Sequence, residues 1–321
     1  MMGVARKLSL LAVTATCLVG AAPPQQQSSS ESADTIAMGR DGSQRMTVPV
    51  WIGDRGPYPF LVDTGAERTM ISGELASSIG LKPGASVEIA TISGLARVGS
   101  FAVDDFTFHK QRTDIQAPAL ARQNIGAAGL IGLDSLGKMR VEFDFAGNRL
   151  RVLPTRNRFL LDRAEVAVDA IERQGRLIFT DATVEGRSIP VVIDTGAEVS
   201  IGNRALFAQM MRSKPHRAHN ALTILSVSGG RVPAEISYAH RMTVGNFDFH
   251  GVPIAFADAH AFRELGLADR PALLLGMNVL RHFDRVTIDF GARQVRFIPE
   301  GYGMRRSQTR MAQAAARAPR S

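Results

Sequence analysis

Two aspartates, Asp63 and Asp194, occupy the same place in two copies of one motif: three apolar residues followed by Asp-Thr-Gly-Ala. The Asp-Thr-Gly triplet is a weak signal by itself, but two copies with matching flanks are far less expected by chance. The apolar residues predict a strand that brings each aspartate to the end of a buried element. Glycine two residues later permits a tight turn in which backbone N–H groups approach the carboxylate.

A close pair of carboxylates is suited to acid–base chemistry on a water molecule. Two carboxylates at hydrogen-bonding distance cannot both ionise, so the pair holds one proton near its working pH. The ionised aspartate can then take a proton from a bound water while the protonated one donates to a carbonyl oxygen. This chemistry hydrolyses an amide bond by direct attack of water, and it implies no metal and no other cofactor.

The two motifs lie in an internal repeat, which predicts the elements that position them. Residues 60–69 align with 191–200 at an offset of 131, and 129–154 align with 273–299 at an offset of 144–145. The second copy therefore carries about 13 additional residues between the aligned blocks. Such a repeat predicts two homologous lobes, each of which supplies one aspartate.

The repeat and the composition of its flanks divide the chain into six segments. We expect a signal peptide (1–21), a flexible linker (22–33), an N-terminal lobe (34–154), a connector (155–163), a C-terminal lobe (164–300) and a basic disordered tail (301–321).

The lobes consist of short β-type runs that are separated by turn sequences. Residues 140–145 and 285–290 alternate polar and apolar side chains before a turn, which is typical of β-hairpins. Short helical turns are expected after each motif and at 134–138 and 278–282. The expected fold class is all-β, with two closed, barrel-like lobes and a cleft between them.

These residues resemble the retropepsin/pepsin superfamily of aspartic peptidases, and most closely its bacterial retroviral-type members. The resemblance covers nearly the whole chain apart from its two ends. It rests on the two Asp-Thr-Gly-Ala motifs and on two apolar-apolar-Gly elements that end at Gly132 and Gly276. The resemblance implies that Asp63 and Asp194 are catalytic and that an extended polypeptide binds between the lobes.

The resemblance also assigns supporting roles around each aspartate. The threonines of the two motifs are expected to interlock the loops, and the residue two positions after each apolar-apolar-Gly element is expected to brace its loop. The implied supporting residues are Thr64, Gly65, Ala66, Gly132 and Asp134 in the first lobe, and Thr195, Gly196, Ala197, Gly276 and Asn278 in the second.

Members of this superfamily close a β-hairpin flap over the substrate, and segments 88–102 and 223–236 fit that position. Neither segment contains the tyrosine of pepsin-like flaps. Both lobes lie on one chain, unlike those of single-lobe retropepsins, so a monomer is expected. The expected flap-tip residues are Ile92, Ser93 and Gly94 in the first lobe and Val227, Ser228 and Gly229 in the second.

Ala66 and Ala197 depart from pepsin-like enzymes, in which Ser or Thr follows the motif's glycine. That hydroxyl bonds an outer carboxylate oxygen and thereby lowers the pKa. Because both positions are alanine here, the pair is expected to titrate higher than the pair in pepsin. Activity is therefore expected to reach towards neutral pH.

The first 21 residues predict export to the periplasm or the exterior. Arg6 and Lys7 precede an apolar run that ends in small residues, which is typical of a cleaved signal and too short for a membrane span. Lipid attachment at Cys17 is the alternative, but the Leu usual three positions upstream is missing. Since Cys17 is the only cysteine, cleavage would leave a chain without thiol chemistry.

Charge and histidine placement argue against other classes of function. Of the formal net charge of +8, the first 21 residues contribute +2 and residues 301–321 contribute +5, so the body is nearly neutral. A nucleic-acid partner is therefore not expected. His216 and His219 have metal-like spacing but lack further ligands nearby, so no metal site is expected. Composition favours disorder of the Arg-rich tail over binding to anionic envelope surfaces.

These observations favour an exported aspartic endopeptidase. Two alternatives stay open: a non-catalytic peptide-binding or assembly module of the same fold, and a processing protease that cuts a single envelope protein.

Overall fold

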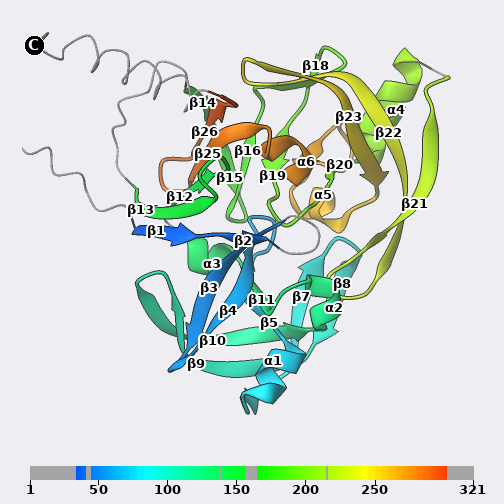
Figure 1. Ribbon diagram of the computed structural model, residues 1–321. Coiled ribbons are helices and arrows are strands. Elements are labelled where there is room, and N and C mark those ends of the chain that lie inside the picture. Colours follow the sequence, from blue (N-terminus) through cyan, green and yellow to red (C-terminus); the bar gives the residue numbers. More distant parts are fainter. Residues whose placement is uncertain (1–33, 41–44, 138, 156–164, 215, 302–321) are drawn as a thin grey trace, which may run out of the picture. The chain divides into compact units, whose positions relative to one another are not determined.

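The computed structural model describes residues 34–40, 45–137, 139–155, 165–214 and 216–301. The expected signal peptide, the linker, Cys17, nearly all of the connector and nearly all of the basic tail lie outside these residues. The described residues belong to one compact unit of the chain. They form two β-rich lobes and a sheet that both lobes share, which confirms the predicted two-lobed all-β fold (Figure 1).

The first lobe is built on an eight-stranded sheet in the order β2-β3-β4-β11-β5-β10-β9-β6, with the separate hairpin β7-β8. Its elements are β2 (Gly39–Arg40), β3 (Met46–Ile52), β4 (Arg55–Val62), β5 (Met70–Ser72), α1 (Gly73–Ser78), β6 (Lys82–Pro83), β7 (Val87–Thr91), β8 (Gly94–Val98), β9 (Ser100–Phe108), β10 (Gln111–Leu120), α2 (Arg122–Ile125), β11 (Gly129–Ile131) and α3 (Leu133–Leu136).

The second lobe repeats this plan in the order β15-β16-β19-β24-β20-β23-β22-β17-β18, with β21 paired to β22. Its elements are β15 (Ile171–Arg173), β16 (Arg176–Phe179), β17 (Ala182–Val184), β18 (Arg187–Ser188), β19 (Val191–Ile193), β20 (Ser200–Gly202), α4 (Arg204–Ser213), β21 (His219–Leu225), β22 (Arg231–Val244), β23 (Phe247–Ala257), α5 (His260–Glu264), β24 (Leu273–Leu275) and α6 (Met277–Leu280).

The third sheet joins the two halves in the order β1-β13-β12-β25-β26-β14. Its strands are β1 (Asp34–Ala37), β12 (Met139–Asp144), β13 (Arg149–Pro154), β14 (Val166–Asp169), β25 (Phe283–Asp289) and β26 (Gln294–Pro299). The predicted hairpins at 140–145 and 285–290 are present, and they lie side by side because β12 pairs antiparallel with β25 (Figure 1). Across this junction, buried Arg140 pairs with buried Asp289 at 2.9 Å.

The strand order places each aspartate at the mouth of its lobe. β4 pairs in parallel with β11, and β11 pairs antiparallel with β5, so the loop between β4 and β5 passes over the end of β11. β19, β24 and β20 repeat the arrangement. The backbone N–H of Asp63 donates to Ile131 at 3.0 Å, and that of Asp194 donates to Leu275 at 3.0 Å. The apolar strand residues before each aspartate are buried, which fixes the start of both loops.

The short helices differ in part from the expectation. α3 and α6 lie close to the predicted turns at 134–138 and 278–282. Immediately after each Asp-Thr-Gly-Ala motif the chain forms turns and bends, and the helices α1 and α4 begin only after β5 and β20. The reason is that each loop must first return to pair with β11 or β24.

Candidate active site

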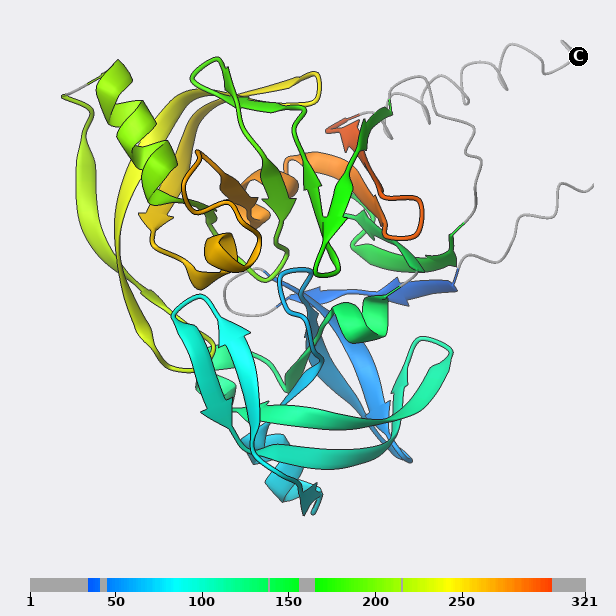
Figure 2. The ribbon, with the colours of Figure 1, turned by 180° about the vertical axis from the view of Figure 1, so that it is seen from behind.

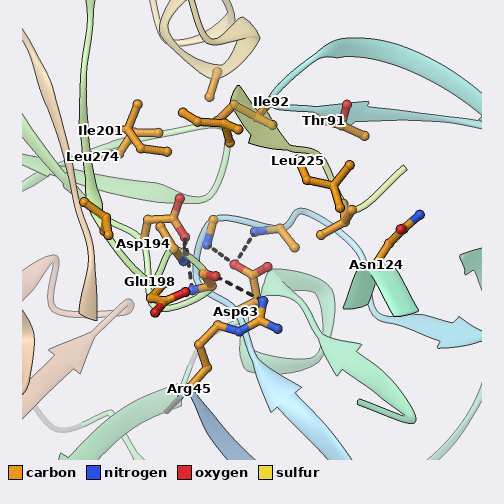
Figure 3. A pocket seen from close by; sticks show the side chains of 18 of the residues that line it. Arg45, Asp63, Thr91, Ile92, Asn124, Asp194, Glu198, Ile201, Leu225 and Leu274 are labelled. Atoms are coloured by element: carbon orange, nitrogen blue, oxygen red, sulfur yellow. Dashed lines mark hydrogen bonds between the residues drawn. The ribbon is translucent and has the colours of Figure 1, made fainter. Parts of the chain in front are cut away.

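Both aspartates are held by backbone donors of their own loop. Asp63 Oδ1 accepts hydrogen bonds from the N–H groups of Gly65 at 2.8 Å and Ala66 at 3.1 Å. Asp194 Oδ1 accepts from Gly196 and Ala197, both at 3.1 Å. Figure 3 shows the two carboxylates close together with these bonds dashed.

Each carboxylate also lies against the glycine of the opposite loop. A Cβ atom added to Gly65 would lie 2.7 Å from Asp194 Oδ1, and one added to Gly196 would lie closer still to the carboxylate of Asp63. Real Cβ atoms do not approach other atoms so closely. Both glycines are therefore required for the two aspartates to meet.

The motif's threonines interlock the two loops. Thr64 N–H donates to Thr195 Oγ1 at 3.1 Å, and Thr195 N–H donates to Thr64 Oγ1 at 3.2 Å. Each hydroxyl in turn donates into the opposite lobe, Thr64 to the carbonyl of Ile193 at 2.9 Å and Thr195 to that of Val62 at 2.7 Å. Both threonines are buried. This closed set of bonds fixes the two loops relative to each other.

In the first lobe, Gly132 and Asp134 support the loop from below. A Cβ at Gly132 would collide with the backbone of Arg68, so the element packs directly under the loop. Asp134 Oδ1 accepts from Thr69 N–H at 2.8 Å and from Thr69 Oγ1 at 2.7 Å. Thr69 Oγ1 also accepts from Gly132 N–H at 3.1 Å.

The second lobe repeats this bracing with an amide in place of the carboxylate. Asn278 Oδ1 accepts from Ser200 N–H and Ser200 Oγ, both at 2.8 Å. Ser200 Oγ accepts from Gly276 N–H at 3.1 Å. Thr69 and Ser200 were not among the residues singled out from the sequence. Thr69 and Ser200 occupy equivalent positions of the repeat, at the offset of 131. A hydroxyl at both positions is the sequence feature from which their supporting role could have been predicted.

A cavity of about 780 Å³ opens above the two aspartates. Its apolar wall comes from two buried clusters, one in each lobe, which include Met70 and Leu130 in the first and Ile201 and Leu274 in the second. These four residues are matched pairs of the repeat. The cavity therefore offers similar apolar surfaces from both lobes; Figure 3 labels Ile201 and Leu274 of the second.

Both segments expected to be flaps form hairpins over this cavity. The first, β7-β8, is shorter than expected because Ser100 already begins β9, and the second, β21-β22, is longer because it starts at His219 (Figure 2). Of the expected tip residues, Ile92 and Val227 line the cavity. Ser93, Ser228 and Gly229 lie in the turns beside them and Gly94 begins β8, and all four lie outside the cavity wall.

Each flap tip reaches into the opposite lobe. The side chain of Ile92 packs against the second-lobe cluster, and that of Val227 packs against the first-lobe cluster. The carbonyl of Ile92 accepts from His260 N–H of α5 at 3.1 Å. The hydroxyls of Ser93 and Ser228 approach to 3.5 Å. The two hairpins therefore cross, and each is anchored by the other half.

Burial dominates the electrostatics of the two aspartates. Burial first, and then the charge of Asp63, raise the pKa of Asp194 from its ordinary value of 3.8 to about 7. Burial also raises the pKa of Asp63, although hydrogen bonds from its own loop and the charges of Arg45 and Arg176 oppose that rise. Two adjacent carboxylates with raised pKa values share a proton over a range that extends towards neutral pH.

Within the described part of the chain, no group of three or more His, Cys, Asp or Glu side chains is placed to hold a metal ion. His216 and His219 are both exposed, and the ring of His219 contacts Phe207. No helix among the described residues is long and apolar enough to cross a membrane.

Comparison with known families adds a finding to this geometry. The family model described as aspartyl protease matches the chain twice, at residues 48–135 and 180–279. Each match contains one Asp-Thr-Gly-Ala motif and one apolar-apolar-Gly element. Comparison with curated proteins gave no significant match.

Proposed function

The chain belongs to the aspartyl protease family, and on this premise we propose that it is an aspartic endopeptidase whose catalytic residues are Asp63 and Asp194. The observation that carries the proposal is the reciprocal packing of each carboxylate against the glycine of the other loop. This packing, together with the threonine interlock, supports a pair of carboxylates that acts on one water molecule.

In the proposed mechanism Asp63 is ionised and Asp194 holds the shared proton. Burial raises the pKa of both aspartates; we place the proton on Asp194 because the negative charge of Asp63 raises its pKa further. Asp63 takes a proton from water as the water oxygen attacks the carbonyl carbon, and Asp194 donates its proton to the carbonyl oxygen. The resulting tetrahedral diol collapses when Asp63 gives its proton to the amide nitrogen and Asp194 takes one from a diol hydroxyl, so that the carbonyl re-forms and the C–N bond breaks. This restores the original protonation of the pair.

The proposed substrate is an extended polypeptide with apolar side chains on both sides of the cleaved bond. The matched pairs Met70 with Ile201 and Leu130 with Leu274 support this preference, because both walls of the cavity carry similar surfaces. Among the described strands, β7 and β8 pair with each other alone and β21 pairs with β22 alone, and an extended peptide can add to such an edge strand. We further propose that the protein acts as an exported monomer, as expected from its N-terminal sequence and its two lobes.

The direct test is digestion of a peptide library by the full chain, with products identified by mass spectrometry between pH 3 and 8. Cleavage between apolar residues is expected. The same preparation carrying Asp63→Asn controls for a contaminating peptidase. Peptides that bind without being cleaved would instead support the non-catalytic module. Cleavage of one envelope protein, but of no library peptide, would identify a narrow processing protease.

The pH–rate profile should reflect the raised pKa values. Loss of the proton on Asp194 is expected to reduce kcat/KM, which reports the free enzyme, as the pH rises through about 7. Protonation of Asp63 should reduce it on the acidic side, at a pH above that of an ordinary aspartate. Measurement of kcat/KM from pH 2 to 9 checks both limbs of the profile. An optimum below about pH 3, in the range of the pepsin pair, would contradict the expectation.

The crossed flaps predict a residue-specific effect on substrate affinity. Ile92→Ser should weaken the packing of the first flap and raise KM by about 10-fold, since Ile92 is partly buried against the second-lobe cluster and full burial of such a side chain contributes about 1.5–3 kcal/mol. Leu95→Ser is the matched control, because Leu95 lies on the same hairpin but is 59% exposed. Steady-state kinetics should show little change for the control. Equal effects of both substitutions would argue against anchoring by Ile92.

A further inference from the structure

Two arginines outside the motifs approach the catalytic loops from the opposite lobes. Arg45 and Arg176 are repeat equivalents, each 18 residues before its own aspartate. Arg176 of the second lobe donates to the carbonyl of Gly65 through Nε at 3.1 Å and Nη2 at 2.9 Å. Arg45 of the first lobe donates to the carbonyl of Gly196 at 3.5 Å. Each arginine thus contacts the Asp-Thr-Gly-Ala loop of the opposite lobe.

A helix of its own lobe holds each arginine in place. Nη1 of Arg176 lies 3.5 Å from Glu264 on α5 and 3.4 Å from Glu67. Nη2 of Arg45 donates to the carbonyl of Ile125 at the end of α2, at 2.5 Å. Arg176 is 4% exposed, and its guanidinium contacts three groups at once. The planar fork of arginine allows this geometry, which a lysine ammonium cannot reproduce.

The contact at Gly65 bears directly on the dyad. The N–H groups of Gly65 and Ala66 bind Asp63, so the orientation of this peptide segment sets the position of the carboxylate. The guanidinium also places a positive charge near both aspartates, where it opposes the effect of burial on their pKa values. The other charged groups at this guanidinium are Glu67 and Glu264, and Glu264 also lies 3.4 Å from His260.

We infer that Arg176 is a positioning residue of the dyad, and that Glu264 orients its guanidinium against the carbonyl of Gly65. This inference rests on the proposed catalytic role of Asp63 and Asp194. Arg45 plays the equivalent part on the other loop through a longer contact. The effect of removing Arg176 should therefore be the larger of the two.

The test compares Arg176→Gln, Arg176→Lys and Glu264→Gln with wild type. Arg176→Gln should lower kcat by about 10- to 100-fold, the size expected from misplacing a catalytic group by a fraction of an ångström, with little change in KM. Because a positive charge is lost, both limbs of its pH–rate profile should move up by about 0.5–1 pH unit. Arg176→Lys keeps the positive charge but loses the planar guanidinium. Its pH–rate profile should therefore lie at the wild-type pH, while its kcat should stay as low as that of Arg176→Gln.

Arg241→Gln is the matched control, since Arg241 forms an exposed pair with Asp248 at 2.8 Å on β22 and β23. Arg241→Gln should leave kcat and both limbs of the pH–rate profile unchanged. A normally folded Arg176→Gln with wild-type kcat and limbs would overturn the inference. If Arg176→Gln does not fold, Glu264→Gln should still lower kcat several-fold, and a wild-type value there would count equally against the inference.

A second readout separates this inference from the proposed function. Carbon-13 NMR of the Asp63 and Asp194 carboxyl groups follows their titration without any substrate. Arg176→Gln should move that titration to higher pH even if the wild type cleaves no peptide. Absence of cleavage with a shifted titration would refute only the peptidase. An unshifted titration would refute the role of Arg176.

Discussion

Asparagine in place of Asp63 or Asp194 is expected to lower kcat/KM by at least about 10³-fold, within the range attributed to a general acid or base. Asparagine has nearly the same shape, so the glycine contacts and the threonine interlock should persist. It cannot accept a proton from water or supply an acidic one. The measurement is cleavage of one defined peptide by both variants. Retention of more than a tenth of wild-type activity by either variant would exclude the two-carboxylate mechanism.

The same substitutions should make the protein more stable at neutral pH. The folded pKa of Asp194, about 7, lies above its ordinary value of 3.8, so its contribution to stability is present below about pH 4. That contribution is lost as the pH rises through about 7. Since one pKa unit corresponds to about 1.4 kcal/mol, the wild type should lose roughly 2–4 kcal/mol relative to Asp194→Asn over this interval.

Thermal unfolding from pH 4 to pH 8 measures this difference. The melting temperature of Asp194→Asn should exceed that of the wild type increasingly as the pH rises. Asp258→Asn is a suitable control, since Asp258 is 69% exposed and its replacement should give a nearly constant difference. A pH-independent difference for Asp194→Asn would show that burial does not raise the pKa of this aspartate.

Gly196→Ala is the second substitution for which a large effect is expected. The added Cβ would occupy the space of the Asp63 carboxylate, so the two loops must separate or Asp63 must turn away. Activity should fall by at least about 10²-fold, as expected when reacting groups move by about 1 Å. Stability should fall by about 1–3 kcal/mol, the usual cost of overpacking.

The matched control for this substitution is Gly99→Ala. An added Cβ at Gly99 meets no atom within 4 Å, so kinetics and melting temperature should stay close to wild type. Gly65→Ala should behave like Gly196→Ala, because its Cβ would lie 2.7 Å from Asp194 Oδ1. Full activity of Gly196→Ala would mean that the aspartates do not meet as the glycine contacts require.

The repeat explains why so much of the fold could be predicted from the sequence. Two copies of one motif at a constant offset predict two equivalent loops, and the alternation of side chains predicts the hairpins of the shared sheet. What the repeat could not predict is that β12 pairs with β25. The hairpins of both copies have the same apolar periodicity, so the pattern alone does not reveal which strand is the neighbour.

The candidate site was predictable only where side chains form a motif. Arg45 and Arg176 align in the repeat, but their acceptors include backbone carbonyls in the other lobe. Because every residue has a backbone carbonyl, the sequence does not indicate which one is the acceptor. The crossing of the flaps could not be predicted either, because the sequence does not indicate what the tip side chains contact. Ile92 and Val227 read as ordinary apolar turn residues, and only the fold shows that each packs into the opposite half.

The sheet shared by the two halves, with Arg140 and Asp289 at its junction, has a consequence for how the pairing of Asp63 with Asp194 depends on protein concentration. Two carboxylates supplied by separate chains would part on dilution, because their encounter would depend on mass action. Here a covalent link keeps the second carboxylate at a high effective concentration beside the first at any dilution. In a dimer of identical chains, every substitution would appear in both halves. Because the two halves here are parts of one chain, one can carry Asp134 while the other carries Asn278.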